Sequence, residues 1–368
     1  MVPALPSTAR QRWHINCFME MQMSNIKCWS LVTSLPFFVS KIATYIYVRG
    51  NNDGRLAQGE VMAFRGNTLP IALRALALSG LLSCVTIVQA APSPPPMRSE
   101  RVTLTSISDS GGKATALFGF WIKSTARGPE KKPTVIALHG CGGLYSVIRD
   151  NRSEFTPRHI AMARALTDAG YNVLFPDSFT PRGKRAICQA SMEQRNISSS
   201  NRRHDVQAAL RWLATQPEVD PSRVALLGWS HGASTLLSAL NLAQTDVAVR
   251  KIQPKAAIAF YPNCVTYAKK TSPYKPAAPL LILMGENDDW TPPEACEALE
   301  KRLEGSDTPI TLRLYPDTYH DFDAPGTPVH VRFDISGAGR DGVTSGANPT
   351  ARADAYKEML KFLKDKFD

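Results

Sequence analysis

The sequence predicts an α/β fold, with a mostly parallel central sheet and helices on both faces. From about residue 100 onward, short runs of apolar and β-branched residues alternate with longer amphipathic stretches. Several of the short runs are continuously apolar, which is the pattern of strands buried on both faces. Strand–helix alternation of this kind is typical of parallel sheets, whose ligands bind beyond the carboxyl ends of the strands.

The expected elements follow one another along the chain. In 157–169, Ile160, Ala163 and Leu166 recur at the spacing of one helical face, and the other expected helices follow the same rule. Strands are expected at 114–123, 134–138, 172–175, 224–227, 256–260, 280–284 and 311–314. Helices are expected at 157–169, 204–215, 233–242, 294–303 and 351–367.

The composition is that of a globular chain with a substantial core. Of the 368 residues, 43% are hydrophobic and 20% are charged. The net charge is +11, but residues 1–90 carry eight basic and three acidic side chains, which leaves +6 on the remainder. Basic side chains there form only short pairs, interpreted as solvated surface, so nucleic acid is not an expected partner. The pairs are Lys131-Lys132, Arg202-Arg203 and Lys269-Lys270.

The first ninety residues resemble a leader rather than part of the domain. Arg65 and Arg74 are followed by an apolar stretch over 75–88, and small Ala90 ends a segment typical of a signal peptidase site. We therefore expect a non-native or disordered extension over 1–61, a signal peptide over 62–90, a linker over 91–99 and the α/β domain over 100–368. The protein would then be exported, to the periplasm or the medium, without stable membrane insertion of the mature domain.

Two alternatives to a cleaved signal peptide remain open. The apolar segment 31–48 could anchor the chain in a membrane, although Pro36 and Lys41 interrupt it. The segment that ends at Cys84 could be a lipoprotein signal, although apolar residues follow it.

After cleavage four cysteines would remain: Cys141, Cys188, Cys264 and Cys296. Four cysteines allow three fully paired connectivities, and the sequence does not choose among them. An oxidising compartment permits disulfides. A single bridge and four unpaired buried thiols are both compatible with the sequence.

The strongest chemical signal is the segment Gly228-Trp229-Ser230-His231-Gly232 between an expected strand and an expected helix. A G-x-S-x-G sequence in this context predicts a nucleophile elbow, the tight turn of the α/β-hydrolase fold. The serine takes strained backbone angles there, so the residues two before and two after it must be small. Ser230 is the predicted nucleophile, and the helix that follows it directs N–H groups at a developing anion.

A serine hydroxyl needs a base, and histidine titrates near neutrality. Among seven histidines, His320 follows the last expected strand, where a loop can return to the serine. His320 is therefore the predicted general base, and His330 is the reserve candidate.

The residue that orients the histidine should follow a strand between the serine and the histidine in the chain. Asp288 follows the apolar strand that ends at Gly285 and is the preferred candidate. Asp289 is the alternative, although a role at the start of the helix near Pro292 suits it better.

An oxyanion hole needs two backbone donors. The N–H of His231 is the first candidate. The second is expected from the glycine-rich loop after the strand 134–138, with the N–H of Cys141 preferred over that of Gly142. The thiol of Cys141 lacks an elbow and is not expected to be the nucleophile. No metal-binding, phosphate-binding or dinucleotide-binding pattern is present in the sequence, so no cofactor or metal is expected.

Six segments together resemble the dienelactone hydrolase family of α/β-hydrolases, over about residues 133–368. They read HGCGG, FPDSFTPRG, GWSHG, YPNC, GENDDWTP and YPDTYHDFD. The resemblance implies a single-domain, cofactor-free hydrolase that acts on a small-molecule ester or lactone. Founding members carry cysteine where Ser230 stands, so this chain resembles a serine variant of the family. They also hold the substrate carboxylate with arginines, and Arg182 matches such a position loosely, with Trp229 as a second candidate contact.

The predicted function is hydrolysis of a carboxylic ester or lactone through an acyl-enzyme. One alternative is a peptidase or acyltransferase that uses the same three side chains. Another is a non-catalytic exported binding protein that keeps the fold. The oligomeric state and the length of the acyl group are not predicted.

Overall fold

The computed structural model describes residues 98–368, apart from 108–113, 148–153, 192–195, 249, 270, 272–273 and 337, together with three short strands near the N-terminus. These are β1 (Gln22–Met23), β2 (Ile26–Cys28) and β3 (Ile46–Tyr47), paired antiparallel in the order β1-β2-β3. The chain divides into two compact units, Met1–Ala91 and Pro92–Asp368.

The expected signal peptide, the extension before it and Cys84 lie outside the described residues, except where β1, β2 and β3 fall within the extension. The alternative anchor 31–48 is described only at β3. Within the part of the chain that the structure describes, no helix is both long and apolar enough to cross a membrane.

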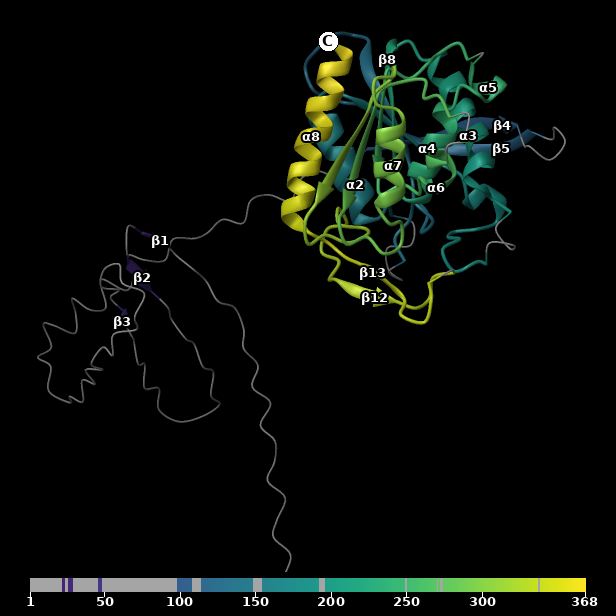
Figure 1. Cartoon of the computed structure of the whole chain (residues 1–368). Coiled ribbons are helices and arrows are strands. Elements are labelled where there is room, and N and C mark those ends of the chain that lie inside the picture. Colours follow the sequence, from purple (N-terminus) through teal and green to yellow (C-terminus); the bar gives the residue numbers. More distant parts are fainter. Residues whose placement is uncertain are drawn as a thin grey trace, which may run out of the picture. The chain divides into compact units, whose positions relative to one another are not determined.

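The second unit is built on an eight-stranded sheet in the order β11-β10-β9-β8-β6-β7-β5-β4 (Figure 1). β5 is antiparallel to both of its neighbours, and all other neighbouring strands are parallel. The strands are β4 (Glu100–Ile107), β5 (Ala114–Ile122), β6 (Lys132–Leu138), β7 (Asn172–Asp177), β8 (Val219–Trp229), β9 (Ala256–Phe260), β10 (Leu280–Gly285) and β11 (Ile310–Tyr315).

Helices cover both faces of this sheet, α2 and α8 on one side and α3, α4 and α7 on the other (Figure 1). Side chains at the start of three of them accept a backbone N–H of the first turn, which satisfies a donor without a helical partner. These caps are Thr156, Ser198 and Asn348. The helices are α2 (Pro157–Asp168), η2 (Thr180–Arg182), α3 (Ser199–Leu213), α4 (His231–Leu240), α5 (Thr245–Ala248), α6 (Val265–Ala268), α7 (Glu294–Arg302) and α8 (Pro349–Phe367).

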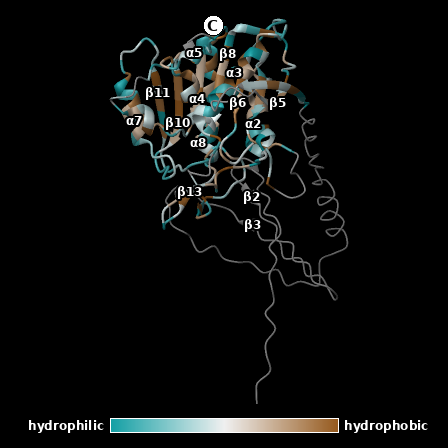
Figure 2. Ribbon diagram, turned by 90° about the vertical axis from the view of Figure 1, so that its right-hand side faces the viewer, coloured by the Kyte–Doolittle hydropathy of each residue, from teal (hydrophilic) through white to brown (hydrophobic). Residues whose placement is uncertain are grey.

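The core lies along the inner strands, which are apolar along their length, while hydrophilic residues lie on the outer loops and helix faces (Figure 2). Every residue of β7, β9 and β10 is buried, whereas the edge strand β11 alternates between buried and exposed positions. The expectation that continuously apolar runs form strands covered on both faces is therefore confirmed.

All seven expected strands and all five expected helices are present, but β8 and α3 each begin five residues earlier than expected, and the other ends shift by at most two residues. In the second unit three strands were not expected, and β1, β2 and β3 of the first unit were not expected either. β4 alternates polar and apolar residues at the edge of the sheet, and β12 (His330–Arg332) pairs with β13 (Val343–Ser345) in a separate antiparallel ribbon. Strands of three residues are too short to show a period in the sequence.

The four cysteines of this unit form two disulfides, Cys141–Cys188 and Cys264–Cys296. The first joins the loop after β6 to the segment that follows η2. The second joins the segment after β9 to helix α7. The structure thus selects one of the connectivities that the sequence left open, with two bridges in place of one or none.

The turn between β8 and α4 depends on close contact with β6. A Cβ atom at Gly232 would lie 2.0 Å from the carbonyl oxygen of Leu138. Gly232→Ala is therefore expected to lower the free energy of unfolding by about 2–3 kcal/mol, as overpacking against backbone does. Gly128, with no atom within 4 Å of such a Cβ, gives the control Gly128→Ala. Urea unfolding with the disulfides intact measures both, and equal midpoints for the two variants would contradict the expectation.

Candidate active site

Ser230 lies at the junction of β8 and α4, in the strained conformation that the elbow predicts. Its backbone angles are φ 50° and ψ −117°, and its N–H donates to the carbonyl oxygen of Phe260 at 2.9 Å. A Cβ at Gly228 would lie 2.6 Å from the carbonyl oxygen of Gly232. The turn therefore closes only with glycine at both positions, as expected from the motif.

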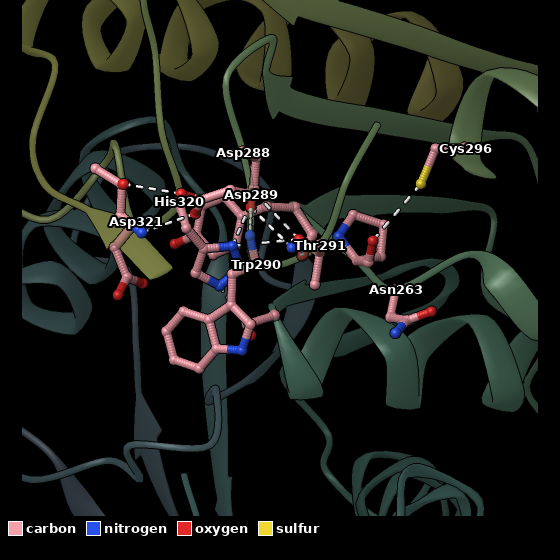
Figure 3. A network of polar contacts seen from close by, with 12 residues as sticks. Asn263, Asp288, Asp289, Trp290, Thr291, Cys296, His320 and Asp321 are labelled. Carbon is pink, nitrogen blue, oxygen red and sulfur yellow. Dashed lines mark hydrogen bonds and ion pairs between the residues drawn. The ribbon is translucent and has the colours of Figure 1, made fainter. Parts of the chain in front are cut away.

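His320, on the loop after β11, reaches back to this serine. Its Nε2 lies 3.0 Å from Oγ of Ser230. Its Nδ1 lies 2.8 Å from Oδ2 of Asp288. The ring is completely buried and contacts those of Tyr261 and Trp290, with centroid distances of 4.4 and 4.5 Å. Figure 3 shows Trp290 beside His320. The three predicted side chains are thus joined in one chain of hydrogen bonds.

Asp288 is fixed by the turn in which it lies. Its Oδ1 accepts the N–H groups of Trp290 and Thr291 at 3.0 and 2.8 Å. Its Oδ2 lies 3.0 Å from the hydroxyl of Thr291 (Figure 3). A buried carboxylate accepts hydrogen bonds only, so it selects the His320 tautomer with the proton on Nδ1. Nε2 is then left to accept the hydroxyl proton of Ser230.

The alternatives to these residues lie elsewhere. Asp289 is exposed, and its carboxylate accepts the N–H and the hydroxyl of Thr344 in β13 at 2.7 and 2.8 Å. The expectation that Asp289 stabilises the start of the next helix is therefore wrong, because it binds the β12–β13 ribbon instead. His330 is exposed on β12, where its Nδ1 lies 2.8 Å from the carbonyl oxygen of Pro328.

The glycine-rich loop 139–143 lies against the elbow. A Cβ at Gly140 would lie 3.6 Å from Cβ of Ser230. The carbonyl oxygen of Gly140 accepts the N–H of Gly143 at 3.1 Å, and Nδ1 of His139 lies 2.9 Å from it. These contacts fix the peptide that carries the N–H of Cys141, one of the two expected oxyanion donors. The other donor, the N–H of His231, belongs to the first residue of α4.

Cys141 itself is tied to a second segment. Its sulfur is bonded to Cys188, and its carbonyl oxygen accepts the N–H of Ile187 at 2.8 Å. The side chain therefore has no thiol to act as a nucleophile. Covalent and hydrogen-bond attachment at one residue limits the movement of the loop beside Ser230.

A buried polar cluster contacts the elbow through the indole of Trp229. Asp323 accepts the indole N–H of Trp229 at 2.7 Å and the hydroxyl of Tyr261. Arg158 lies 3.2 Å from Asp323 and 2.6 Å from Asp321. Burial raises the pKa of Asp323, against the opposing charge of Arg158. Burial alone would also raise the pKa of Asp321, but the guanidinium of Arg158 lowers it.

Three further side chains that the sequence singled out are engaged within the protein. The indole of Trp229 is completely buried against Asp323, so it cannot contact substrate. The guanidinium of Arg182 binds both oxygens of Asp205 at 2.8 Å and the carbonyl oxygen of Ser178 at 2.7 Å, so its donors already hold its own loop. Arg202, interpreted as solvated surface, is completely buried.

The polar partners around the three predicted residues were not identified from the sequence. Trp290 and Thr291 lie in the turn of Asp288, whereas Tyr261 follows β9, so only the folded structure brings them together against His320. A signal existed for Asp323, which lies three residues after His320 in a short segment that mixes aromatic and acidic residues. Among the residues that the structure describes, no group of three or more potential ligands could hold a metal ion.

Comparison with known proteins agrees with this geometry. The model of the dienelactone hydrolase family matches residues 122–367. The chain belongs to the dienelactone hydrolase family. Residues that carry the elbow, Asp288 and His320 all lie within the matched range, so the expected family and fold class are confirmed.

The relatives and solved structures that this chain resembles are distant in sequence. The "Probable 2-oxo-3-(5-oxofuran-2-ylidene)propanoate lactonase" of Bradyrhizobium sp is 25% identical over 202 residues, which cover 52% of this chain and 73% of that protein. A dienelactone hydrolase-like promiscuous phosphotriesterase from metagenomic libraries is 18% identical, with a TM-score of 0.51 over 73% of this chain and 99% of that chain. Esterase 2 of Thermogutta terrifontis is 17% identical, with a TM-score of 0.50 over 74% and 97%. The two structures show the shared fold.

Arg158 neutralises two carboxylates, one of which is completely buried. Arg158→Met is expected to lower the free energy of unfolding by about 3–5 kcal/mol, because Asp323 is left as an unpaired buried charge. Adding Asp323→Asn should restore part of the loss. Arg223→Met removes the more exposed pair with Asp220, separated by 2.7 Å, and should cost less than about 1 kcal/mol. Chemical unfolding measures all three variants, and equal losses for Arg158→Met and Arg223→Met would contradict the prediction.

Proposed function

We propose that the protein hydrolyses a carboxylic ester or lactone through an acyl-enzyme formed on Ser230. The observation that carries this proposal is the hydrogen-bond chain from Oγ of Ser230 through His320 to Asp288, with distances of 3.0 and 2.8 Å. Family membership supports the same class of reaction. The serine elbow favours an ordinary serine esterase or lactonase over the cysteine chemistry of the founding members.

In the proposed first half-reaction, Oγ of Ser230 attacks the substrate carbonyl carbon while its proton passes to Nε2 of His320. Asp288 stabilises the imidazolium through its contact with Nδ1. The carbonyl oxygen becomes an oxyanion, which the N–H groups of His231 and Cys141 would stabilise at the start of α4. As the tetrahedral intermediate collapses, the bond to the leaving oxygen breaks and His320 returns the proton to it.

In the second half-reaction, water gives a proton to His320 and its oxygen attacks the acyl carbon. The acid product leaves when the bond to Oγ of Ser230 breaks and His320 returns the proton to the serine. A linear ester releases its alcohol before this step, whereas a lactone keeps its alcohol on the acyl group. The lactonase name of the Bradyrhizobium relative supports a lactone as one of the substrates to test.

We also propose that the second unit works outside the cytoplasm, after removal of the leader 62–90. Two disulfides within this unit support an oxidising compartment, since such bonds are rare in cytosolic proteins. The leader pattern in the sequence supports the same location.

Ser230→Ala is expected to lower ester turnover by about 10⁶-fold, because no other group supplies the nucleophile. Steady-state hydrolysis of p-nitrophenyl esters of graded acyl length, followed at 405 nm, would measure turnover, and a fluorophosphonate probe would report labelling of Ser230. Circular dichroism should match that of the wild type. Undiminished turnover in the variant would refute the proposed nucleophile, and an unlabelled wild type would favour a binding protein instead.

Asp288→Asn should lower turnover by about 10⁴-fold, because an amide that donates to Nδ1 selects the wrong tautomer of His320. The neighbouring variant Asp289→Asn is the matched control and should stay close to the wild type, since Asp289 binds Thr344 in the ribbon. Turnover at saturating substrate distinguishes the two. A larger loss in Asp289→Asn than in Asp288→Asn would reverse the assignment.

A further inference from the structure

Arg202 is a completely buried cation next to the elbow, and the proposed reaction has not used it. It lies on α3, with its guanidinium 5.0 Å from the centroid of the Phe179 ring. Its Nη1 lies 2.9 Å from Nδ1 of His231, and its Nη2 donates to the carbonyl oxygen of His139 at 2.9 Å. These two acceptors belong to the two segments that carry the proposed oxyanion donors.

The contact with His139 continues to the N–H of Cys141. Nε2 of His139 accepts the N–H of Ser178 at 3.2 Å, which leaves the imidazole proton on Nδ1. Nδ1 then donates to the carbonyl oxygen of Gly140 at 2.9 Å. The N–H of a trans peptide points opposite to its carbonyl, so this bond fixes the direction of the N–H of Cys141. Burial and the charge of Arg202 both lower the pKa of His139, which keeps the ring neutral, as this arrangement requires.

The contact with His231 fixes the other segment. A guanidinium can only donate, so Nδ1 of His231 accepts and its ring is oriented by Arg202. One rigid, planar group therefore connects the first residue of α4 to the loop after β6. Lysine has a single charged atom and cannot reproduce this geometry.

Arg202 forms no hydrogen-bonded ion pair within its own helix, although the charges of Asp205 and Asp177 still act on it and oppose the effect of burial on its pKa. Asp205, one turn further along α3, gives both carboxylate oxygens to Arg182 at 2.8 Å. Burial lowers the pKa of Arg202 to about 10, so the side chain remains cationic at neutral pH. A cation in a buried setting behind two N–H donors strengthens their attraction for a developing anion.

We propose that Arg202 is a positioning residue of the oxyanion hole, which holds the loop 139–143 and the start of α4 in register and adds positive potential behind them. This inference rests on the proposed function, because it requires an oxyanion at Ser230. A purely structural buried arginine would affect folding but would not act preferentially on the transition state.

The test compares Arg202→Gln with Arg250→Gln. Arg250 is the matched control, because it donates to the carbonyl oxygen of Ala239 at 2.6 Å near the other end of α4. Burial lowers its pKa to about 10 as well. Both variants remove a cation that is hydrogen-bonded to α4, Arg202 at His231 and Arg250 at Ala239. Only Arg202 contacts the end of α4 that adjoins Ser230. Each is assayed for kcat and KM on p-nitrophenyl acetate, for the rate of Ser230 labelling by a fluorophosphonate, and for melting temperature.

We expect Arg202→Gln to lower kcat by about 10–100-fold, less than the loss of an entire oxyanion donor, with little change in KM. The labelling rate should fall in parallel, because the phosphoryl oxygen occupies the same hole. Arg250→Gln should keep kcat and the labelling rate close to those of the wild type at a comparable melting temperature. Arg202→Lys, which keeps the charge but not both contacts, should fall between Arg202→Gln and the wild type.

Equal kcat and labelling rates for Arg202→Gln and Arg250→Gln would overturn the inference, as would a loss confined to KM. If Arg202→Gln does not fold, Arg202→Lys decides: wild-type labelling overturns the inference and slower labelling supports it. A wild-type protein that the fluorophosphonate does not label would refute the proposed function and this inference together. If the fluorophosphonate labels the wild type and the Arg202→Gln variant keeps the wild-type kcat and labelling rate, the inference is refuted while the proposed function stands.

Discussion

Backbone strain at one residue, Ser230, organises the rest of the site. A non-glycine residue in such a conformation costs about 1–3 kcal/mol and persists only when its surroundings determine it. Here the N–H of Ser230 is held by Phe260, and Gly232 presses against the end of β6. The turn therefore brings three neighbouring strands, β6, β8 and β9, into contact at the point where each of them ends.

Ser230 lies at the end of β8, an inner strand of the sheet. The side chains and N–H groups that act with it therefore come from loops, which the hydrogen bonds of the sheet do not fix. His320 is held by contacts with two tilted aromatic rings and by Asp288, whose Oδ1 is occupied by its own turn. The loop 139–143 is held by a disulfide on one side and by Arg202 on the other. Arg158 holds the segment after His320 through ion pairs with Asp321 and Asp323. Each loop is thus fixed by interactions outside the sheet.

Sequence reasoning found the residues whose positions follow from strand order and turn sterics. Ser230, Asp288 and His320 each follow a recognisable strand, and parallel strands bring their carboxyl ends to the same edge. It could not find residues whose role depends on tertiary contacts. Arg202 has the same local pattern as a surface pair, and only the carbonyl oxygen of His139 and the ring of His231 explain its burial. The cysteine pairing, Arg182 and Trp229 were undetermined or misjudged for the same reason.

The enclosure of His320 has a consequence for the sequence of events. The histidine and Asp288 are 0% and 2% exposed, whereas Ser230 retains 9%, so in the proposed reaction water would approach Nε2 of His320 from the side of the hydroxyl. Incoming water would then use the space that the departing alcohol has just vacated. In a ring-opened lactone the alcohol stays attached to the acyl group. It could therefore attack the acyl carbon and re-form the lactone until it moves away from Ser230. In the proposed reaction, departure of the first product would therefore precede entry of the water that completes turnover.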